Sequence, residues 1–322
     1  MAIETQQQRI FITGASGYIG SVVTELAIAD GYAVHGLSRT EASDAKLRAL
    51  GAVPVRGDLT SLDVLRRESA AADVVIHLAT AYVFGDPDGY AAALPIDNAA
   101  ADALADGLAG TDKPLVVTSG TLAVAADPSG AETTESSPPD PNPINTRIDA
   151  ERHALSLAGR RGVRVMAVRL APYVYGRGGS GVKLFLDMSA RAGSVACVGG
   201  GANRTTVVHV DDAARLYLLA ALRGGGRAGE VYNASAATDV TARQMFGAIA
   251  DALGVPVRDV AREDAAAQMG EMVAAFLAAE NRASGEKARR ELGWRPEGVG
   301  ILEDISKGSY QPVAEALRKG SA

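Results

Sequence analysis

The sequence predicts an α/β fold in which a doubly wound parallel sheet carries a smaller C-terminal lobe. Over about the first 170 residues, short apolar runs alternate with longer stretches of helical periodicity. The apolarity of the short runs is nearly continuous, which is typical of strands buried on both faces of a parallel sheet. The succession of strand, helix and strand then implies right-handed crossovers with helices on both faces of the sheet.

Six segments are predicted strands, and they read RIFITG, YAVHGLS, AVPVRGDL, DVVIHLATA, PLVVTSG and VRVMAVRLA. The helix predicted between the first two, GSVVTELAIADG, has apolar residues at helical spacing and ends at Gly31, a natural C-cap. Further helices are predicted near 98–109 and 144–159. The Pro/Ser-rich segment 127–143 is predicted to be either a mobile surface connection or a lid.

The sequence pattern changes after residue 176, where glycine clusters lie on both sides of a helical stretch. A second lobe is predicted to begin there. The segments TVVHVDDAARLYLLAAL and EVYNASA again resemble a strand with a helix and a short strand. We therefore assign residues 1–176, with returns at 205–235, to the first domain. Residues 177–204 and 236–322 form the second lobe, whose tail contains two amphipathic helical patterns that end at Gly254 and Gly293.

Composition narrows the functional classes. The 322 residues suffice for one large or two medium domains, and the 47% hydrophobic and 22% charged residues are typical of a soluble globular protein. The net charge of −6 argues against a general affinity for nucleic acid or acidic membranes. The lone cysteine, Cys197, has no partner for an internal disulfide, and no spacing typical of metal ligands is present. We expect a cytoplasmic protein with a small-molecule ligand and no metal.

The segment TGASGYIG joins the first strand to the first helix. Gly14, Gly17 and Gly20 allow a tight turn and a close backbone approach, and the helix N-terminus offers free N–H groups to a pyrophosphate. The spacing is GxxGxxG rather than GxGxxG, but its position between strand and helix is the expected one. The first domain is therefore predicted to be a Rossmann-type dinucleotide-binding domain, and its contacts in this loop include Ser16, Tyr18 and Ile19.

The end of the second strand predicts which dinucleotide binds. An acidic residue there would hold the ribose hydroxyls of NAD, whereas this chain has Ser38 and Arg39. A hydroxyl and a guanidinium suit a 2′-phosphate, which favours NADP. The alternative is that Arg39 is a solvated loop residue.

Several motifs, in order, identify a family resemblance: TGASGYIG, RGDL at 56–59, HLAT at 77–80, RLAPYVYG at 169–176, VHVDD at 208–212 and ELGWRP at 291–296. The chain resembles the extended short-chain dehydrogenases/reductases, which include NAD(P)-dependent epimerases, dehydratases and ketone reductases. The resemblance implies that Asp58 and Leu59 flank the adenine. It further implies that Leu78, Ala79 and Thr80 pass the cofactor's centre and that Pro172, Tyr173 and Val174 lie beside the nicotinamide.

The chain departs from this family where the chemistry is expected. Members usually carry a tyrosine and, four residues later, a lysine that lowers the tyrosine's pKa. A glutamate often follows that lysine by four more residues, and with Glu151 in the glutamate position Arg147 stands in the lysine position and Pro143 in the tyrosine position. Arginine can hold ribose hydroxyls and supply positive charge, but its pKa is too high for proton relay, and proline has no acid. No tyrosine occurs between Tyr90 and Tyr173, so another register does not restore the pair.

Other side chains are candidates for the missing group. The segment TSGT after the fifth strand offers Thr118, Ser119 and Thr121. Ser119 or Thr121 could hydrogen-bond a substrate carbonyl, or these hydroxyls bond their own backbone or, like Thr118, the cofactor. Tyr173 or Tyr175 could replace the lost phenol, with core packing as the alternative.

The remaining candidates concern the substrate. Tyr82 and Phe84 are predicted walls of an apolar pocket, or ordinary core residues. Arg204, in VGGGANR, occupies a region similar to that where epimerases grip a nucleotide-sugar phosphate, and a solvated arginine is the alternative. We expect structural roles for His77 in HLAT, for His153 on a helix face and for Asp211 and Asp212 as helix-capping residues.

Together these features predict an NADPH-dependent reductase of a C=N or C=O group, that is, an imine or carbonyl reductase that works without the usual tyrosine. An imine or iminium fits well because it arrives already activated by protonation. The alternatives are an NADP(H)-binding sensor without turnover and a non-redox isomerase or cyclase on the same scaffold. Extended members often form dimers through two helices, and 98–109 and 144–159 resemble those helices, so a homodimer is also possible.

Overall fold

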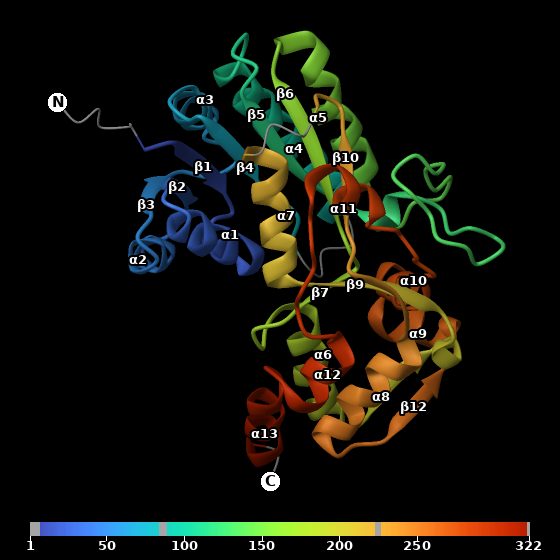
Figure 1. The fold of residues 1–322 in the computed structure, drawn as a ribbon. Coiled ribbons are helices and arrows are strands. Elements are labelled where there is room, and N and C mark those ends of the chain that lie inside the picture. The colour runs from blue at the N-terminus through green and yellow to red at the C-terminus, as the bar shows by residue number, and fades with distance from the viewer. Residues whose placement is uncertain (1–6, 84–88, 223–226, 321–322) are drawn as a thin grey trace.

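The computed structural model describes residues 7–83, 89–222 and 227–320, and it confirms the predicted doubly wound sheet (Figure 1). Seven strands pair in parallel in the order β10-β6-β5-β4-β1-β2-β3. They are β1 (Arg9–Thr13), β2 (Ala33–Ser38), β3 (Val53–Arg56), β4 (Val74–His77), β5 (Pro114–Gly120), β6 (Arg164–Leu170) and β10 (Val231–Ala234). The six predicted strands account for β1 to β6, and EVYNASA supplies β10.

Helices cover both faces of this sheet. On one face lie α1 (Tyr18–Ala29), α2 (Glu41–Ala49), α7 (Val210–Leu222) and α11 (Glu286–Leu292), packed in a core with Ile10, Ile12 and Trp294. The opposite face carries α3 (Leu62–Ala70), α4 (Gly89–Gly107) and α5 (Arg147–Arg161) around Phe11, Val75 and Leu104. Because both faces are covered, the strands are apolar on both sides, which explains their continuous apolar sequences.

The second lobe has its own core, which includes Leu186, Phe246 and Ile305. Its elements are α6 (Ser180–Ala192), β8 (Val195–Val198), α8 (Ala242–Leu253), β12 (Val257–Val260), α9 (Arg262–Met269), α10 (Glu271–Ala278), α12 (Ile301–Lys307) and α13 (Gln311–Gly320). A three-stranded sheet of β7 (Tyr173–Tyr175), β9 (Arg204–His209) and β11 (Ala237–Thr241) lies between this lobe and the large sheet (Figure 1). The predicted helix ends hold, since Gly254 and Gly293 end α8 and α11 in the left-handed conformation.

Two predicted helices have different bounds. α4 begins at Gly89, well before residue 98, although Pro95 lies inside it. α5 begins only at Arg147, whose N–H donates to the Asn145 side-chain oxygen (3.0 Å). No described helix combines the length and the apolarity needed to cross a bilayer.

Part of the segment 127–143 is anchored to the tail of the chain. The Thr133 N–H donates to the Arg282 carbonyl (2.9 Å), and the Ser284 N–H donates to the Thr133 carbonyl (2.8 Å). The Gly130 carbonyl also accepts a hydrogen bond from the Arg282 guanidinium (2.5 Å). This segment, predicted as a mobile connection or a lid, is thus tied by backbone pairing to residues 282–284.

Candidate functional site

The loop between β1 and α1 has the geometry of a phosphate cradle. Gly14 has a positive φ of 73°, and a Cβ on Gly20 would lie 2.0 Å from the Gly14 carbonyl oxygen. Gly17 is the N-cap of α1, and no acidic residue stands in the first turn of that helix. The N–H groups at this helix start have no intrahelical acceptor, and the helix dipole is positive there. The loop therefore fits the pyrophosphate of a dinucleotide.

The other residues of this loop contact neighbouring segments of the chain. The Tyr18 hydroxyl donates to the Gly176 carbonyl (2.7 Å), which ties the loop to the segment that follows β7. Lys46 of α2 donates to the Ser16 carbonyl (2.7 Å) and adds a positive charge beside the cradle. Ile19 packs against the core on the α1 face. Sequence reasoning missed Lys46, since no motif links it to the loop.

Ser38 and Arg39 stand at the carboxyl end of β2. Ser38 is buried, and its hydroxyl donates to the Thr40 carbonyl (3.2 Å). Arg39 is exposed and forms no ion pair with any residue in the described ranges. Its guanidinium is therefore available to an anion at this edge of the sheet.

The segments that follow β3 and β4 lie at the same edge of the sheet, formed by the carboxyl ends of the strands. The Asp58 carboxylate accepts hydrogen bonds from the Thr60 hydroxyl and N–H and from Ser61, which lowers the pKa of Asp58. Leu59 is buried. Leu78 and Ala79 are half-buried after β4, and the backbone of Ala79 contacts Gly14, where an added Cβ would lie 3.0 Å from the Ala79 N atom.

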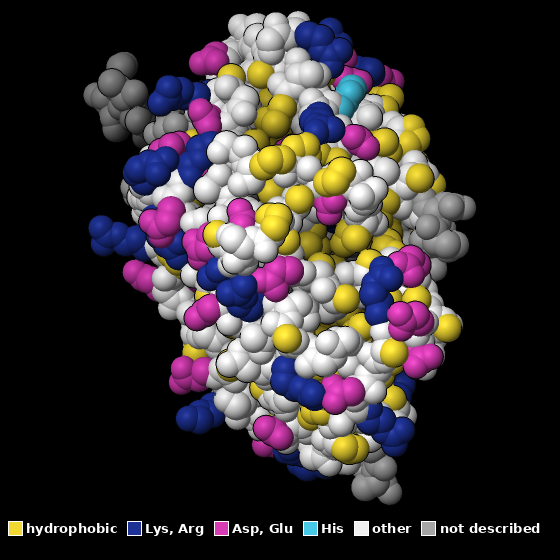
Figure 2. All heavy atoms as spheres, turned by 90° about the vertical axis from the view of Figure 1, so that its right-hand side faces the viewer, with side chains coloured by type: hydrophobic (Ala, Val, Ile, Leu, Met, Phe, Trp, Pro, Cys, Tyr) yellow, Lys and Arg dark blue, Asp and Glu magenta, His cyan; other side chains and the backbone are white. Residues whose placement is uncertain are grey.

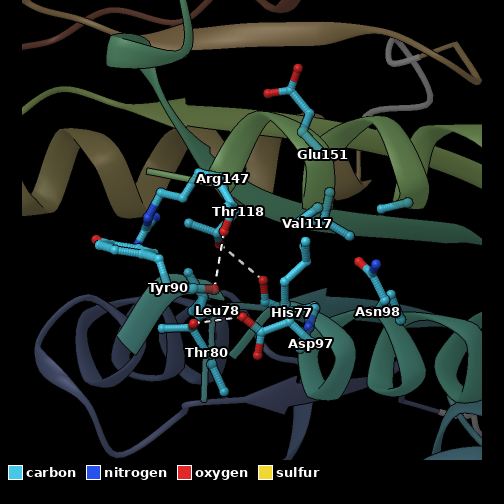
Figure 3. A pocket seen from close by; sticks show the side chains of 16 residues that line it. His77, Leu78, Thr80, Tyr90, Asp97, Asn98, Val117, Thr118, Arg147 and Glu151 are labelled. Carbon is cyan, nitrogen blue, oxygen red and sulfur yellow. Dashed lines mark hydrogen bonds between the residues drawn. The ribbon is translucent and has the colours of Figure 1, made fainter. Parts of the chain in front are cut away.

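A cavity of about 60 Å³ lies between the ends of β4 and β5 and the helices α4 and α5 (Figure 3). Its polar lining includes His77, Thr80, Tyr90, Asp97, Asn98, Thr118 and Arg147. Asp97 accepts hydrogen bonds from the Thr80 hydroxyl and the Ala81 N–H, both at 2.7 Å. Thr118 donates to the His77 carbonyl (2.9 Å) and hydrogen-bonds the buried Tyr217 hydroxyl (2.8 Å), so its hydroxyl is occupied.

Arg147 stands at the mouth of this cavity as the first residue of α5. Its guanidinium carbon lies 5.6 Å from the centre of the Tyr90 ring. An added Cβ on Gly120, the last residue of β5, would lie 3.9 Å from Arg147 Cδ, so the strand end that faces Arg147 offers no hydroxyl at this position. Pro143 is exposed and precedes the helix. Glu151, the anchor of the register, instead forms a buried ion pair with Arg169 of β6 (2.6 Å).

The two hydroxyls predicted to polarise a substrate do not line the cavity. Ser119 is fully buried, and its hydroxyl has no partner among the described residues. The Thr121 hydroxyl donates to the Asn281 side-chain oxygen (2.9 Å), and the Asn281 amide donates to the Thr121 carbonyl (3.3 Å). Sequence reasoning missed this role of Asn281, because the two residues are 160 positions apart.

The tyrosines of RLAPYVYG point into the second lobe. Tyr173 is 5% exposed, and its ring packs on Phe276 with 5.5 Å between ring centroids. Burial raises the pKa of Tyr173 far above its usual range. The Tyr175 hydroxyl donates to the Val299 carbonyl (2.7 Å), and burial raises its pKa as well. The structure therefore places these side chains in packing positions, while Pro172 is half-buried and Val174 joins the core of the α1 face.

The predicted substrate residues are scattered. Arg204 forms an ion pair with Glu280 (3.0 Å), and its guanidinium also donates to the Gly130 carbonyl (3.3 Å). Tyr82 stacks on Tyr90, with ring centroids 3.9 Å apart. Phe84 lies outside the described residues.

The residues expected to be structural make contacts of that kind. His77 shares a 2.7 Å hydrogen bond with Thr13, and burial lowers its pKa to about 4. His153 lies 3.2 Å from Asp102, between α5 and α4. Rather than capping α7, the Asp212 carboxylate accepts hydrogen bonds from the backbone N–H groups of Glu297 and Gly298, both at 2.9 Å. Asp211 pairs with Arg177 (2.7 Å).

The surface is hollowed in two further places. On the face that lies to the right in Figure 1, hydrophobic side chains gather in a hollow between the large sheet and the second lobe (Figure 2). A separate cleft of ≈ 710 Å³ is lined by Tyr175, Trp294 and Ile301, and it shares no lining residue with the cavity at Arg147. The glycine loop and the cavity at Arg147 both contact the segment that follows β4.

Comparisons with known proteins agree with this geometry. A model of the NAD dependent epimerase/dehydratase family matches residues 10–235. An uncharacterized protein of Schizosaccharomyces pombe is 34% identical over 94% of this chain and 99% of its own length. The 4-hydroxy-2-methyl-3-oxo-4-farnesyl-3,4-dihydroquinoline-1-oxide ketoreductase of Stigmatella aurantiaca is 28% identical over 89% of this chain and 91% of its own. Among solved structures, a double mutant of the dTDP-glucose 4,6-dehydratase DesIV of Streptomyces venezuelae with NAD bound is 25% identical, with a TM-score of 0.77 over 98% of this chain and all of that chain.

Proposed function

The chain belongs to the NAD-dependent epimerase/dehydratase family, within the extended short-chain dehydrogenases/reductases, and we propose that it is an NADP(H)-dependent reductase of a C=N or C=O group in a small organic molecule. The observation that carries the proposal is the pairing of an intact glycine cradle with a cationic site at Arg147. The relative from Stigmatella aurantiaca that is named a ketoreductase supports carbonyl reduction.

The chain offers a consistent set of contacts for the nucleotide. Gly14, Gly17 and Gly20 would receive the pyrophosphate, and Asp58 with Leu59 would border the adenine. Arg39 would face a 2′-phosphate, which is our reason to propose NADP rather than NAD, whereas the buried Ser38 hydroxyl is bonded to the Thr40 carbonyl. When bound, the nicotinamide supplies a hydride.

Arg147 would act through its charge. A guanidinium is a permanent cation, so it can bind ribose hydroxyls and stabilise negative charge that develops on a substrate oxygen or nitrogen. Thr121 has no proton-transfer role in this proposal, because its hydroxyl is bound to Asn281. Ser119 is fully buried, so the proposal gives its hydroxyl no contact with the substrate.

The decisive experiment measures NADPH oxidation with a panel of cyclic imines, iminium salts and ketones. Substrate-dependent loss of NADPH absorbance, with the reduced product identified by mass spectrometry, is the expected result. Tight NADP(H) binding in calorimetry with no oxidation by any substrate would favour the sensor instead. A product that forms without added nicotinamide nucleotide would favour an isomerase or cyclase.

We also infer a cytoplasmic homodimer. α4 and α5 lie side by side on one face of the sheet, and they correspond to the two helices through which extended members often form dimers. Sedimentation equilibrium is expected to give twice the monomer mass of 33.0 kDa, and a monomeric mass would contradict this inference.

A further inference from the structure

We propose that Tyr90 of α4 is the proton donor of this enzyme and that it takes the place of the phenol that α5 lacks. The inference rests on the proposed reductase function and extends it to substrates with a neutral carbonyl group. Such substrates need a proton on oxygen when hydride adds to carbon.

Tyr90 lines the cavity at Arg147. It lies in the first turn of α4. The guanidinium carbon of Arg147, the first residue of α5, lies over the Tyr90 ring, 5.6 Å from its centroid. Its ring stacks on Tyr82 with an interplanar angle of 16°. Figure 3 shows the phenol oxygen at the outer end of the ring, pointing away from Asp97 and Asn98 and beside the Arg147 side chain.

The backbone of Tyr90 is fixed by the start of α5. The Thr146 hydroxyl does not cap its own helix but donates to the Tyr90 carbonyl (3.0 Å). The Arg147 N–H is satisfied instead by the Asn145 side-chain oxygen (3.0 Å). The adjacent Gly89 leaves room for the stack, because a Cβ there would lie 2.9 Å from Tyr82 Cε2. Two neighbouring helix starts thus hold the phenol and the guanidinium together.

The other tyrosines near the site are unsuited to this role. Tyr217 is fully buried, and its hydroxyl is bonded to Thr118. Tyr173 is buried among the aromatic rings of the second lobe, and the Tyr175 hydroxyl is bonded to Val299. Tyr90 is half-buried, and the Arg147 guanidinium lies over the Tyr90 ring. It therefore combines access to a ligand with a fixed cation.

The proton transfer balances. As the carbonyl carbon accepts a hydride from NADPH, the Tyr90 hydroxyl donates its proton to the carbonyl oxygen, and an alcohol and NADP⁺ result. The phenolate left on Tyr90 is stabilised by the Arg147 guanidinium and regains a proton from water. An iminium ion already carries its proton, so its reduction does not need this step.

The test is Tyr90→Phe, which keeps the ring, the stack and the cation–π contact but removes the acid. For ketones we expect kcat to fall by about 100-fold or more, which is the range of general acid catalysis. For a permanently charged iminium substrate we expect a change of no more than about threefold. Tyr32→Phe, on the distant β2 side of the sheet, is the matched control and should behave as the wild type.

Binding gives a readout that does not depend on turnover. Calorimetry should show that Tyr90→Phe binds NADPH as the wild type does. The affinity of a ketone for the complex with NADP⁺ should fall by about fivefold, since one hydrogen bond is lost.

The outcomes separate this proposal from the reductase function. Ketone reduction at the wild-type rate by Tyr90→Phe, or an equal loss with ketone and iminium substrates, overturns the role of Tyr90 and leaves the reductase function standing. A wild-type enzyme that reduces iminium ions but no ketone has the same meaning. If the wild-type enzyme oxidises NADPH with none of the imines, iminium salts and ketones tested, both proposals are overturned.

Discussion

Arg39 shows how one exposed side chain can set nucleotide preference. Replacing it with aspartate would place a carboxylate where we propose that a 2′-phosphate binds. Because a charge-assisted hydrogen bond is lost and a repulsion is added, we expect the preference for NADPH over NADH to fall by about 10- to 100-fold. Dissociation constants for both nucleotides from calorimetry measure this ratio.

The control is Arg258→Asp, which makes the same change in charge at an exposed position of β12 in the second lobe. An unchanged ratio in Arg39→Asp would mean that Arg39 is a solvated residue, and the preference for NADP would have to come from elsewhere.

His77 gives a second prediction for a single residue, this time in stability. Burial lowers its pKa to about 4, below the usual value of 6.5, so the unfolded chain binds a proton at higher pH than the folded chain. The folded state therefore loses stability as the pH falls from 6.5 towards 4, by up to about 3 kcal/mol from this group. Urea unfolding across this range should show the loss, and His77→Gln should flatten it. An identical pH slope in the variant would contradict the assignment.

Among the elements, the turn between β1 and α1 depends most on a missing side chain. In Gly20→Ala the new Cβ would lie 2.0 Å from the Gly14 carbonyl oxygen, and a backbone atom cannot yield as a flexible side chain can. We expect a loss of about 2 kcal/mol or more in the free energy of unfolding, with weakened nucleotide binding. Chemical unfolding and calorimetry measure the two effects.

A glycine in another helix supplies the matched control. Among the described residues, no atom outside the backbone of α5 lies within 4 Å of a Cβ added to Gly159, so Gly159→Ala should stabilise the protein by about 0.5–1 kcal/mol. Equal effects of the two substitutions would show that the turn tolerates a side chain and that its glycines have no steric role.

At the scale of the whole molecule, Asn281 joins the tail of the chain to the end of β5. Asn281→Ala would leave the hydroxyl of the buried Thr121 without its acceptor, and the Thr121 carbonyl would keep only the hydrogen bond from the Val124 N–H, so we expect a loss of about 2 kcal/mol in the free energy of unfolding. Because the neighbouring residues 282–284 anchor the segment 127–143, limited proteolysis within this segment should become faster.

The exposed Asn142 lies in the same segment, and Asn142→Ala is the control for sequence effects on the protease. If both variants are cut at the same rate, the contact between Thr121 and Asn281 does not hold the segment in place.

The sequence by itself determined the sheet, the family and the phosphate cradle. These follow from local patterns, since a strand buried on both faces needs continuous apolar residues, and a tight turn into α1 needs glycines at 14, 17 and 20. The absence of a tyrosine four residues before Arg147 was also readable, although only the structure shows that α5 begins at Arg147 and that Pro143 stands outside it.

Only the tertiary structure decided which side chains meet. The position of Arg147 over the Tyr90 ring and the bond between Thr121 and Asn281 join segments that are far apart along the chain. Such contacts depend on how α4 packs beside α5 and on where the tail returns to the large sheet. Periodicity reports which face of an element is buried, but the residue that a side chain touches is set by the packing of whole elements.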